Sequence, residues 1–141
     1  MLGYALNGLS IDNKQFDVLN KIGILFQIKD DLLGIFSNEE ITGKSNKSDI
    51  EEFKQTILYS YIINTSYKNN FLDIYGKNNI TDKDLEDIRE LLYKSGALDY
   101  ANIYMDNLIA ELNDSIDALD ISDEGKDIFK GLILYINLRE K

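Results

Sequence analysis

The sequence predicts an all-α fold, and three observations lead to this expectation. The chain has 141 residues and no proline, although average usage would place about seven in a chain of this length. Proline is the commonest helix breaker, so its absence favours continuous helices. Apolar residues recur at spacings of three and four along most of the chain, and helix-capping residues stand where these patterns begin. We therefore expect a helical bundle that forms a single domain over residues 1–141.

The first two expected helices cover residues 12–36 and 49–75. Asp12 is the cap of the first, and Ser48 opens a Ser-x-x-Glu capping box before the second. Residues 37–47 between them are rich in Ser, Asn, Thr and Gly, which is typical of a loop.

Three further helices are expected at residues 82–95, 98–120 and 123–139. Thr81 with Asp84, and Ser122, give their start signals, while Gly76 and Gly96 follow apolar runs as stop signals. The clearest apolar stripe consists of Leu98, Ala101, Met105, Leu108, Leu112, Ile116 and Leu119. Such stripes are mostly core packing.

Composition excludes several classes of chemistry. The chain has no His and no Cys, which excludes Ser-His-Asp triads, His-based zinc sites, disulfides and thiolate nucleophiles. A net charge of −10 argues against nucleic-acid binding through phosphate contacts. The apolar runs are too short to span a membrane, and the first residues lack the pattern of a signal peptide, so we expect a cytoplasmic protein.

One face of the first helix carries polar groups within an apolar segment. Residues 22–36 are apolar around most of the helix, which predicts a central helix covered by its neighbours. Yet Gly23, Gln27, Asp30, Asp31 and Gly34 share one face. Two buried carboxylates need a cation. Two interpretations stay open: a solvated notch or a lysine pair, and an Mg²⁺ site that combines one or two carboxylates with substrate phosphates.

Complementary charge follows in the stretch GKSNKSDIEEFKQT. It contains Lys44 after a glycine, Asp49 at the expected helix start, and Lys54 followed by Thr56. Ammonium groups near a carboxylate-bound Mg²⁺ would suit a diphosphate.

These residues resemble a known family. Phe26-Gln27-x-x-Asp30-Asp31, followed by Gly43-Lys44, Ser48-Asp49 and Lys54-x-Thr56, is similar to the second aspartate-rich motif and lid of trans-isoprenyl diphosphate synthases, the polyprenyl synthetases. The resemblance covers essentially the whole chain and implies the C-terminal half of the all-α isoprenoid synthase fold. It implies a transferase of the geranyl, farnesyl or geranylgeranyl type, in which an allylic diphosphate ionises with Mg²⁺ and condenses with isopentenyl diphosphate.

The resemblance also implies roles for individual residues: Asp30 and Asp31 bind Mg²⁺, Gln27, Lys44 and Lys54 contact the diphosphate, and Asp49 and Thr56 support the lid or the second metal shell. Gly34 stands where the family usually has a third Asp. The expected consequence is a weaker metal site, or one completed by water.

Family members are longer, and their first half carries the other aspartate-rich motif. We therefore expect the chain alone to be inactive and to need an N-terminal half or a partner synthase subunit. The alternatives are a noncatalytic subunit or truncated remnant that binds a partner synthase, and a helical interaction module without a diphosphate site. Apolar residues on more than one face predict self-association as a homo-oligomer; they are Ile22, Leu25, Phe26, Ile62, Ile63 and Phe71.

Overall fold

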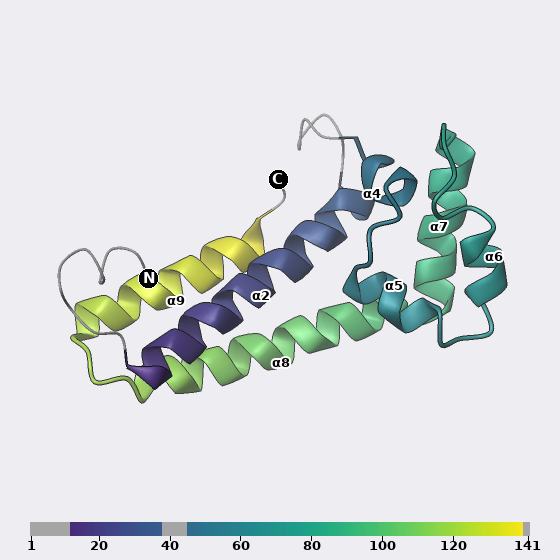
Figure 1. Cartoon of the computed structure of the whole chain (residues 1–141). Coiled ribbons are helices and arrows are strands. Elements are labelled where there is room, and N and C mark those ends of the chain that lie inside the picture. The colour runs from purple at the N-terminus through teal and green to yellow at the C-terminus, as the bar shows by residue number, and fades with distance from the viewer. Residues whose placement is uncertain (1–11, 38–44, 140–141) are drawn as a thin grey trace.

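The computed structural model describes residues 12–37 and 45–139, and every regular element in these ranges is an α-helix. The helices are α2 (Asn13–Phe36), α4 (Ser48–Glu51), α5 (Ile57–Ile62), α6 (Lys68–Leu72), α7 (Asp82–Lys94), α8 (Ala97–Asp117) and α9 (Asp123–Leu138). The long helices α2, α8 and α9 pack on one another, and α4 to α7 gather at one end of α8 (Figure 1). The expected all-α fold is confirmed.

Most predicted helix starts are confirmed by hydrogen bonds. The side chains of Asp12 and Ser122 accept from the backbone N–H three residues later, at the starts of α2 and α9. Thr81 and Asp84 form a complete capping box at the start of α7. Gly96 separates α7 from α8 with φ of 86°, a left-handed conformation in which glycine avoids the Cβ clash of other residues.

The predicted continuous helix over residues 49–75 is wrong. The structure has three short helices there, α4, α5 and α6, separated by turns. The Thr56 hydroxyl accepts from Tyr59 N and restarts the helix as the N-cap of α5, and Thr65 bonds Ile62 O and Tyr67 N at its end. Such side-chain bonds to nearby backbone compete with helical hydrogen bonds. The predicted Ser48 capping box is wrong as well, since α4 begins at Ser48 without a side-chain cap.

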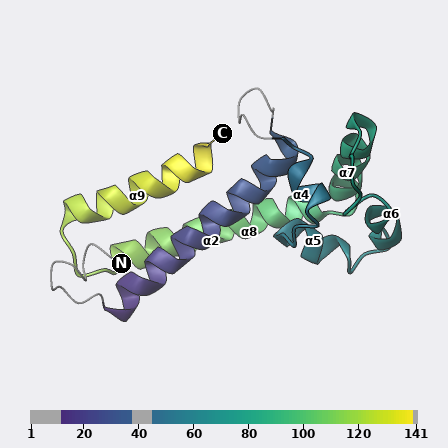
Figure 2. The ribbon, with the colours of Figure 1, turned by 45° about the horizontal axis from the view of Figure 1, so that its top comes forward.

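The core lies where α2 crosses α8 and where α5, α7 and α9 pack around this pair (Figure 2). The predicted stripe from Ala101 to Leu119 is buried, whereas Leu98 is partly buried. These residues belong to the same hydrophobic cluster as Val18, Leu25 and Ile35 of α2. Burial of such side chains contributes about 1.5–3 kcal/mol each. Among the described helices, none combines the length and the apolar character that crossing a membrane requires.

Outside α8, the exposed large apolar side chains lie mainly on α2 and α9. Of the residues expected to be uncovered, Ile22, Leu25, Ile62 and Phe71 are buried in the core, so that part of the expectation is wrong. Phe26 is 44% exposed, so α2 is not covered on all sides as its sequence predicted. The other exposed apolar side chains of these two helices are Phe16, Ile24, Ile128, Leu132, Leu134, Tyr135 and Leu138.

Candidate functional site

Asp31 is the centre of a polar cluster near the C-terminal end of α2. Its side chain is only 7% exposed, and its Oδ1 atom lies 3.0 Å from Lys54 Nζ. Gln27, one turn earlier on α2, donates from Nε2 to the same oxygen at 2.9 Å. The two side chains that the sequence placed on one helical face therefore meet, and the lysine arrives from the segment between α4 and α5.

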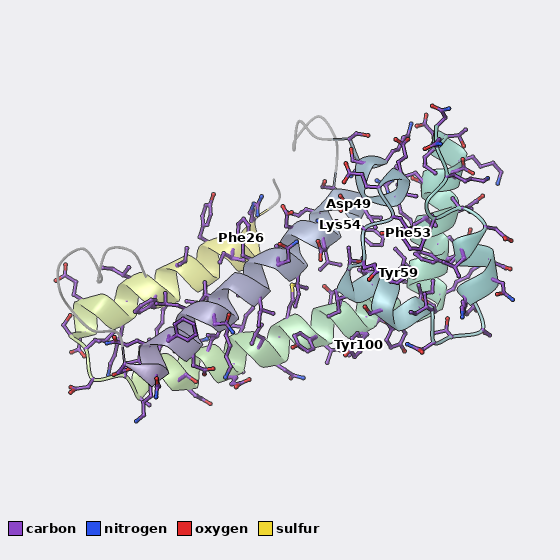
Figure 3. All side chains as sticks on the ribbon, in the orientation of Figure 1. Phe26, Asp49, Phe53, Lys54, Tyr59 and Tyr100 are labelled. Atoms are coloured by element: carbon purple, nitrogen blue, oxygen red, sulfur yellow. The ribbon has the colours of Figure 1, made fainter. Side chains whose placement is uncertain are left out.

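Asp49 adds a second buried carboxylate to this cluster. It lies on α4, its side chain is 3% exposed, and its Oδ2 atom is 3.8 Å from Lys54 Nζ. Figure 3 shows Asp49 and Lys54 together beside the end of α2. Burial acts to lower the pKa of Lys54, but the hydrogen bond with Asp31 and the charges of Asp31, Asp49 and Asp30 outweigh it and raise the pKa above its ordinary value. The Lys54 side chain is therefore protonated and positively charged at neutral pH.

The structure explains why position 34 is a glycine, which the sequence did not reveal. A Cβ atom at this position would lie 2.5 Å from Asp49 Oδ2, so any larger residue would displace the buried carboxylate. The place that a third Asp side chain would occupy on α2 is thus next to the carboxylate of Asp49. Asn46 fixes the same corner by donating to Gly34 O at 3.3 Å.

Aromatic side chains hold the segment that carries Lys54. Tyr75 donates from its hydroxyl to Lys54 O at 2.5 Å. Phe53 has φ of 54°, and its ring lies 5.3 Å from that of Tyr59 and 5.5 Å from that of Tyr75. A left-handed conformation is unfavourable for a bulky residue, and these ring contacts offset its cost. No local sequence signal points to Tyr75, because the contact joins residues on different elements.

Asp30 forms an ion pair with a different residue, Arg139. Arg139, at the end of α9, places Nη2 3.5 Å from Asp30 Oδ1, and its guanidinium lies 4.8 Å over the ring of Phe26. Nothing in the local sequence pattern around Arg139 links this residue to Asp30, so the contact could not be predicted from the sequence. Thr56 takes no part in the charged cluster, since it is buried as the N-cap of α5. The expected residue Lys44 lies outside the described residues.

The acidic side chains here fit a hard cation of the Mg²⁺ kind. Within residues 12–37 and 45–139, no group of three or more acidic side chains is arranged to hold a metal ion by itself. Asp30 and Asp31 are adjacent on α2, and the side chain of Asp30 is 32% exposed. Magnesium commonly takes one or two carboxylates and completes its shell with water and phosphate oxygens. The donor set is therefore suitable for an ion that binds together with a diphosphate.

We predict that Gly34→Ala destabilises the protein, because the new methyl group collides with Asp49 Oδ2. The expected loss in free energy of unfolding is about 1–3 kcal/mol, as for overpacking. Gly23→Ala, on the same helix with nothing within 4 Å of its Cβ position, should instead stabilise by about 0.5–1 kcal/mol. Urea unfolding measures both. Equal stabilisation by the two changes would show that Asp49 does not restrict position 34.

We predict that Tyr75 contributes to a loss of stability at alkaline pH. Burial, followed by the charges of Asp49, Asp31 and Tyr59, raises the pKa of Tyr75 in the folded protein. Its contribution is fully present below the unfolded pKa of about 10 and declines as the pH rises above it. Tyr75→Phe should cost about 1 kcal/mol at pH 7 for the lost bond to Lys54 O and should show a shallower decline above pH 10. Tyr93→Phe, at an exposed tyrosine, is the control. It should change neither the free energy of unfolding at pH 7 nor its decline above pH 10, both measured by urea unfolding.

Known proteins support a family assignment. A family model described as polyprenyl synthetase matches residues 1–92. The chain is 30% identical over 135 residues to a geranylfarnesyl diphosphate synthase of Aeropyrum pernix, a match that covers 95% of this chain and 42% of the relative. It is 37% identical over 98 residues to a geranylgeranyl diphosphate synthase of Methanosarcina mazei, covering 70% of this chain and 29% of the relative.

Solved structures agree with these matches. The geranylgeranyl pyrophosphate synthase of Corynebacterium glutamicum, crystallised with isoprenyl diphosphate and magnesium, is similar with a TM-score of 0.81 at 28% identity, over 98% of this chain and 41% of that one. The chain spans less than half the length of these relatives. Since the family model matches more than half of its residues, the chain belongs to the polyprenyl synthetase family.

Proposed function

We propose that this chain is part of a prenyltransferase of isoprenoid biosynthesis, in which it supplies the second aspartate-rich motif and the lid. The proposed reaction is the Mg²⁺-dependent condensation of an allylic diphosphate with isopentenyl diphosphate. The observation that carries the proposal is the 3.0 Å contact of Lys54 with the buried carboxylate of Asp31, supported by the hydrogen bond from Gln27. It joins the cation and the carboxylate that the family resemblance assigns to one site.

Each residue has a physical task in this proposal. Asp30 and Asp31 hold the ion, which neutralises the negative charge that develops on the leaving diphosphate. Lys54 stays charged and has three N–H donors, so it can keep its bond to Asp31 and donate to a phosphate oxygen as well. Asp49 adds a second negative charge 3.8 Å from the Lys54 ammonium group and helps to hold it in place. Lys44 would add a second ammonium group to the diphosphate.

The proposal also includes what the chain does not supply. Residues 1–141 would form one domain that pairs with the first half of a synthase, which brings the other aspartate-rich motif. The similarity to relatives more than twice as long supports this. The alternative is a noncatalytic subunit or remnant that binds a partner synthase, and the exposed apolar side chains of α9 support it.

We predict that a bisphosphonate binds this chain at least about tenfold more tightly with Mg²⁺ than with EDTA, a difference of roughly 1.4 kcal/mol. Asp31→Asn should remove this metal effect, because the carboxylate that holds the ion is lost. Asp117→Asn, an exposed carboxylate at the end of α8, removes the same charge and should keep the effect. Calorimetric titration measures each case, and circular dichroism checks folding. Equal binding with and without metal would refute the role of the carboxylates.

We predict that the chain associates through α9, where Leu134 and Leu138 are 57% and 68% exposed one helical turn apart. Light scattering should show a mass that rises with concentration. Changing both leucines to lysine should leave a monomer, whereas Ile103→Lys, at an exposed position of α8, should not. Adding the first half of a related synthase should compete with the association and restore some prenyl transfer. A wild-type chain that stays monomeric and binds no hydrophobic dye would contradict this prediction.

A further inference from the structure

Arg139 joins the end of the chain to the aspartate motif. Its Nη2 lies 3.5 Å from Asp30 Oδ1, and its guanidinium lies over Phe26. Nη1 is buried and has no hydrogen-bond partner within the part of the chain that the structure describes. The guanidinium therefore lies between two side chains of α2 that belong to the motif itself.

The position of Arg139 is fixed by the helix that carries it. Lys29 donates from Nζ to Asn137 O at 2.9 Å, which ties the last turn of α9 to α2. Ile133 and Ile136 of α9 are buried in the core. Because α9 is anchored by these contacts, the guanidinium remains close to Asp30 without needing a short ion pair to hold it there.

Asp31 and Asp30 form ion pairs that differ in length and in the exposure of the carboxylate. Asp31 is 7% exposed and lies 3.0 Å from Lys54, whereas Asp30 is 32% exposed and its contact with Arg139 is 3.5 Å. A long, partly exposed ion pair is weak, since water screens it. A divalent ion carries twice the charge of the guanidinium and can therefore displace it from Asp30, while Asp31 keeps its lysine.

We propose that Arg139 is a built-in competitor of the metal: it neutralises Asp30 when no ion is bound and must release this carboxylate before Mg²⁺ can bind. This proposal depends on the metal role proposed above for Asp30 and Asp31. The end of α9 thereby acts as an autoinhibitory contact on the metal site. A role for Arg139 limited to the C-terminus of α9, where cations are favourable, would give no effect on metal affinity.

The test is a titration of the full chain with Mn²⁺, in which electron paramagnetic resonance measures the concentration of free ion. Arg139→Gln should bind Mn²⁺ about fivefold more tightly than the wild type, the factor that corresponds to a weak ion pair. Arg139→Lys keeps the charge and should stay close to the wild type. Lys130→Gln is the matched control: Lys130 lies on the same helix and pairs with Asp117, so the change removes one positive charge but leaves the Lys29 anchor and the Asp30 contact in place. Its Mn²⁺ affinity should change less than twofold. Thermal melting verifies that each variant folds.

The outcomes separate this proposal from the proposed function. If Asp30→Asn and Asp31→Asn weaken Mn²⁺ binding while Arg139→Gln leaves it unchanged or weakens it, the metal site stands and the competitor role is refuted. An equal gain in Arg139→Gln and Lys130→Gln also refutes it, since the effect is then one of general charge. If neither aspartate variant changes Mn²⁺ binding, the metal role in the proposed function fails and the competitor role fails with it.

Discussion

The ion pair between Asp31 and Lys54 is the interaction on which the rest of the site depends. The Asp31 carboxylate is taken out of water while Lys54 stays 33% exposed, and good geometry with further hydrogen bonds is needed to offset the cost of burying that charge. Here Gln27 donates to the same carboxylate oxygen, and Asp49 Oδ2 lies 3.8 Å from the ammonium group. Lys54 lies in the non-helical segment between α4 and α5. The break in the helix therefore places the lysine that pairs with Asp31.

A second layer of contacts keeps this interrupted segment in place. Phe53 has a left-handed backbone, which costs about 1–2 kcal/mol for an ordinary residue. Its ring packs against Tyr59 and Tyr75, and the Tyr75 hydroxyl holds Lys54 O. The aromatic contacts thus stabilise a backbone shape that local preference disfavours. Strain of this kind persists only where the surroundings over-determine the conformation, and it is found mainly at functional sites.

Periodicity and capping predicted α2, α7, α8 and α9 because their start signals and apolar stripes are local. They failed for residues 49–75, where no Pro or Gly marks the breaks and the competing hydrogen bonds of Thr56 and Thr65 decide the outcome. The same distinction holds at the site. Gln27 and Asp31 share a helical face, which spacing alone reveals, and the family resemblance supplied Lys54. Tyr75 and Arg139 reach the site through tertiary packing, which no local pattern encodes.

The dependence on packing extends beyond the matched family region. The family model covers residues 1–92, yet α2 buries its apolar face against α8 and α9, which lie beyond that limit. Asp30 and Asp31 are thus positioned by helices without motif residues, and the cation beside Asp30 comes from the end of α9. Lys54 pairs with Asp31, and Arg139 pairs with Asp30, so each motif aspartate has a cation that another part of the chain supplies. The elements that position these two cations therefore matter as much as the aspartates themselves.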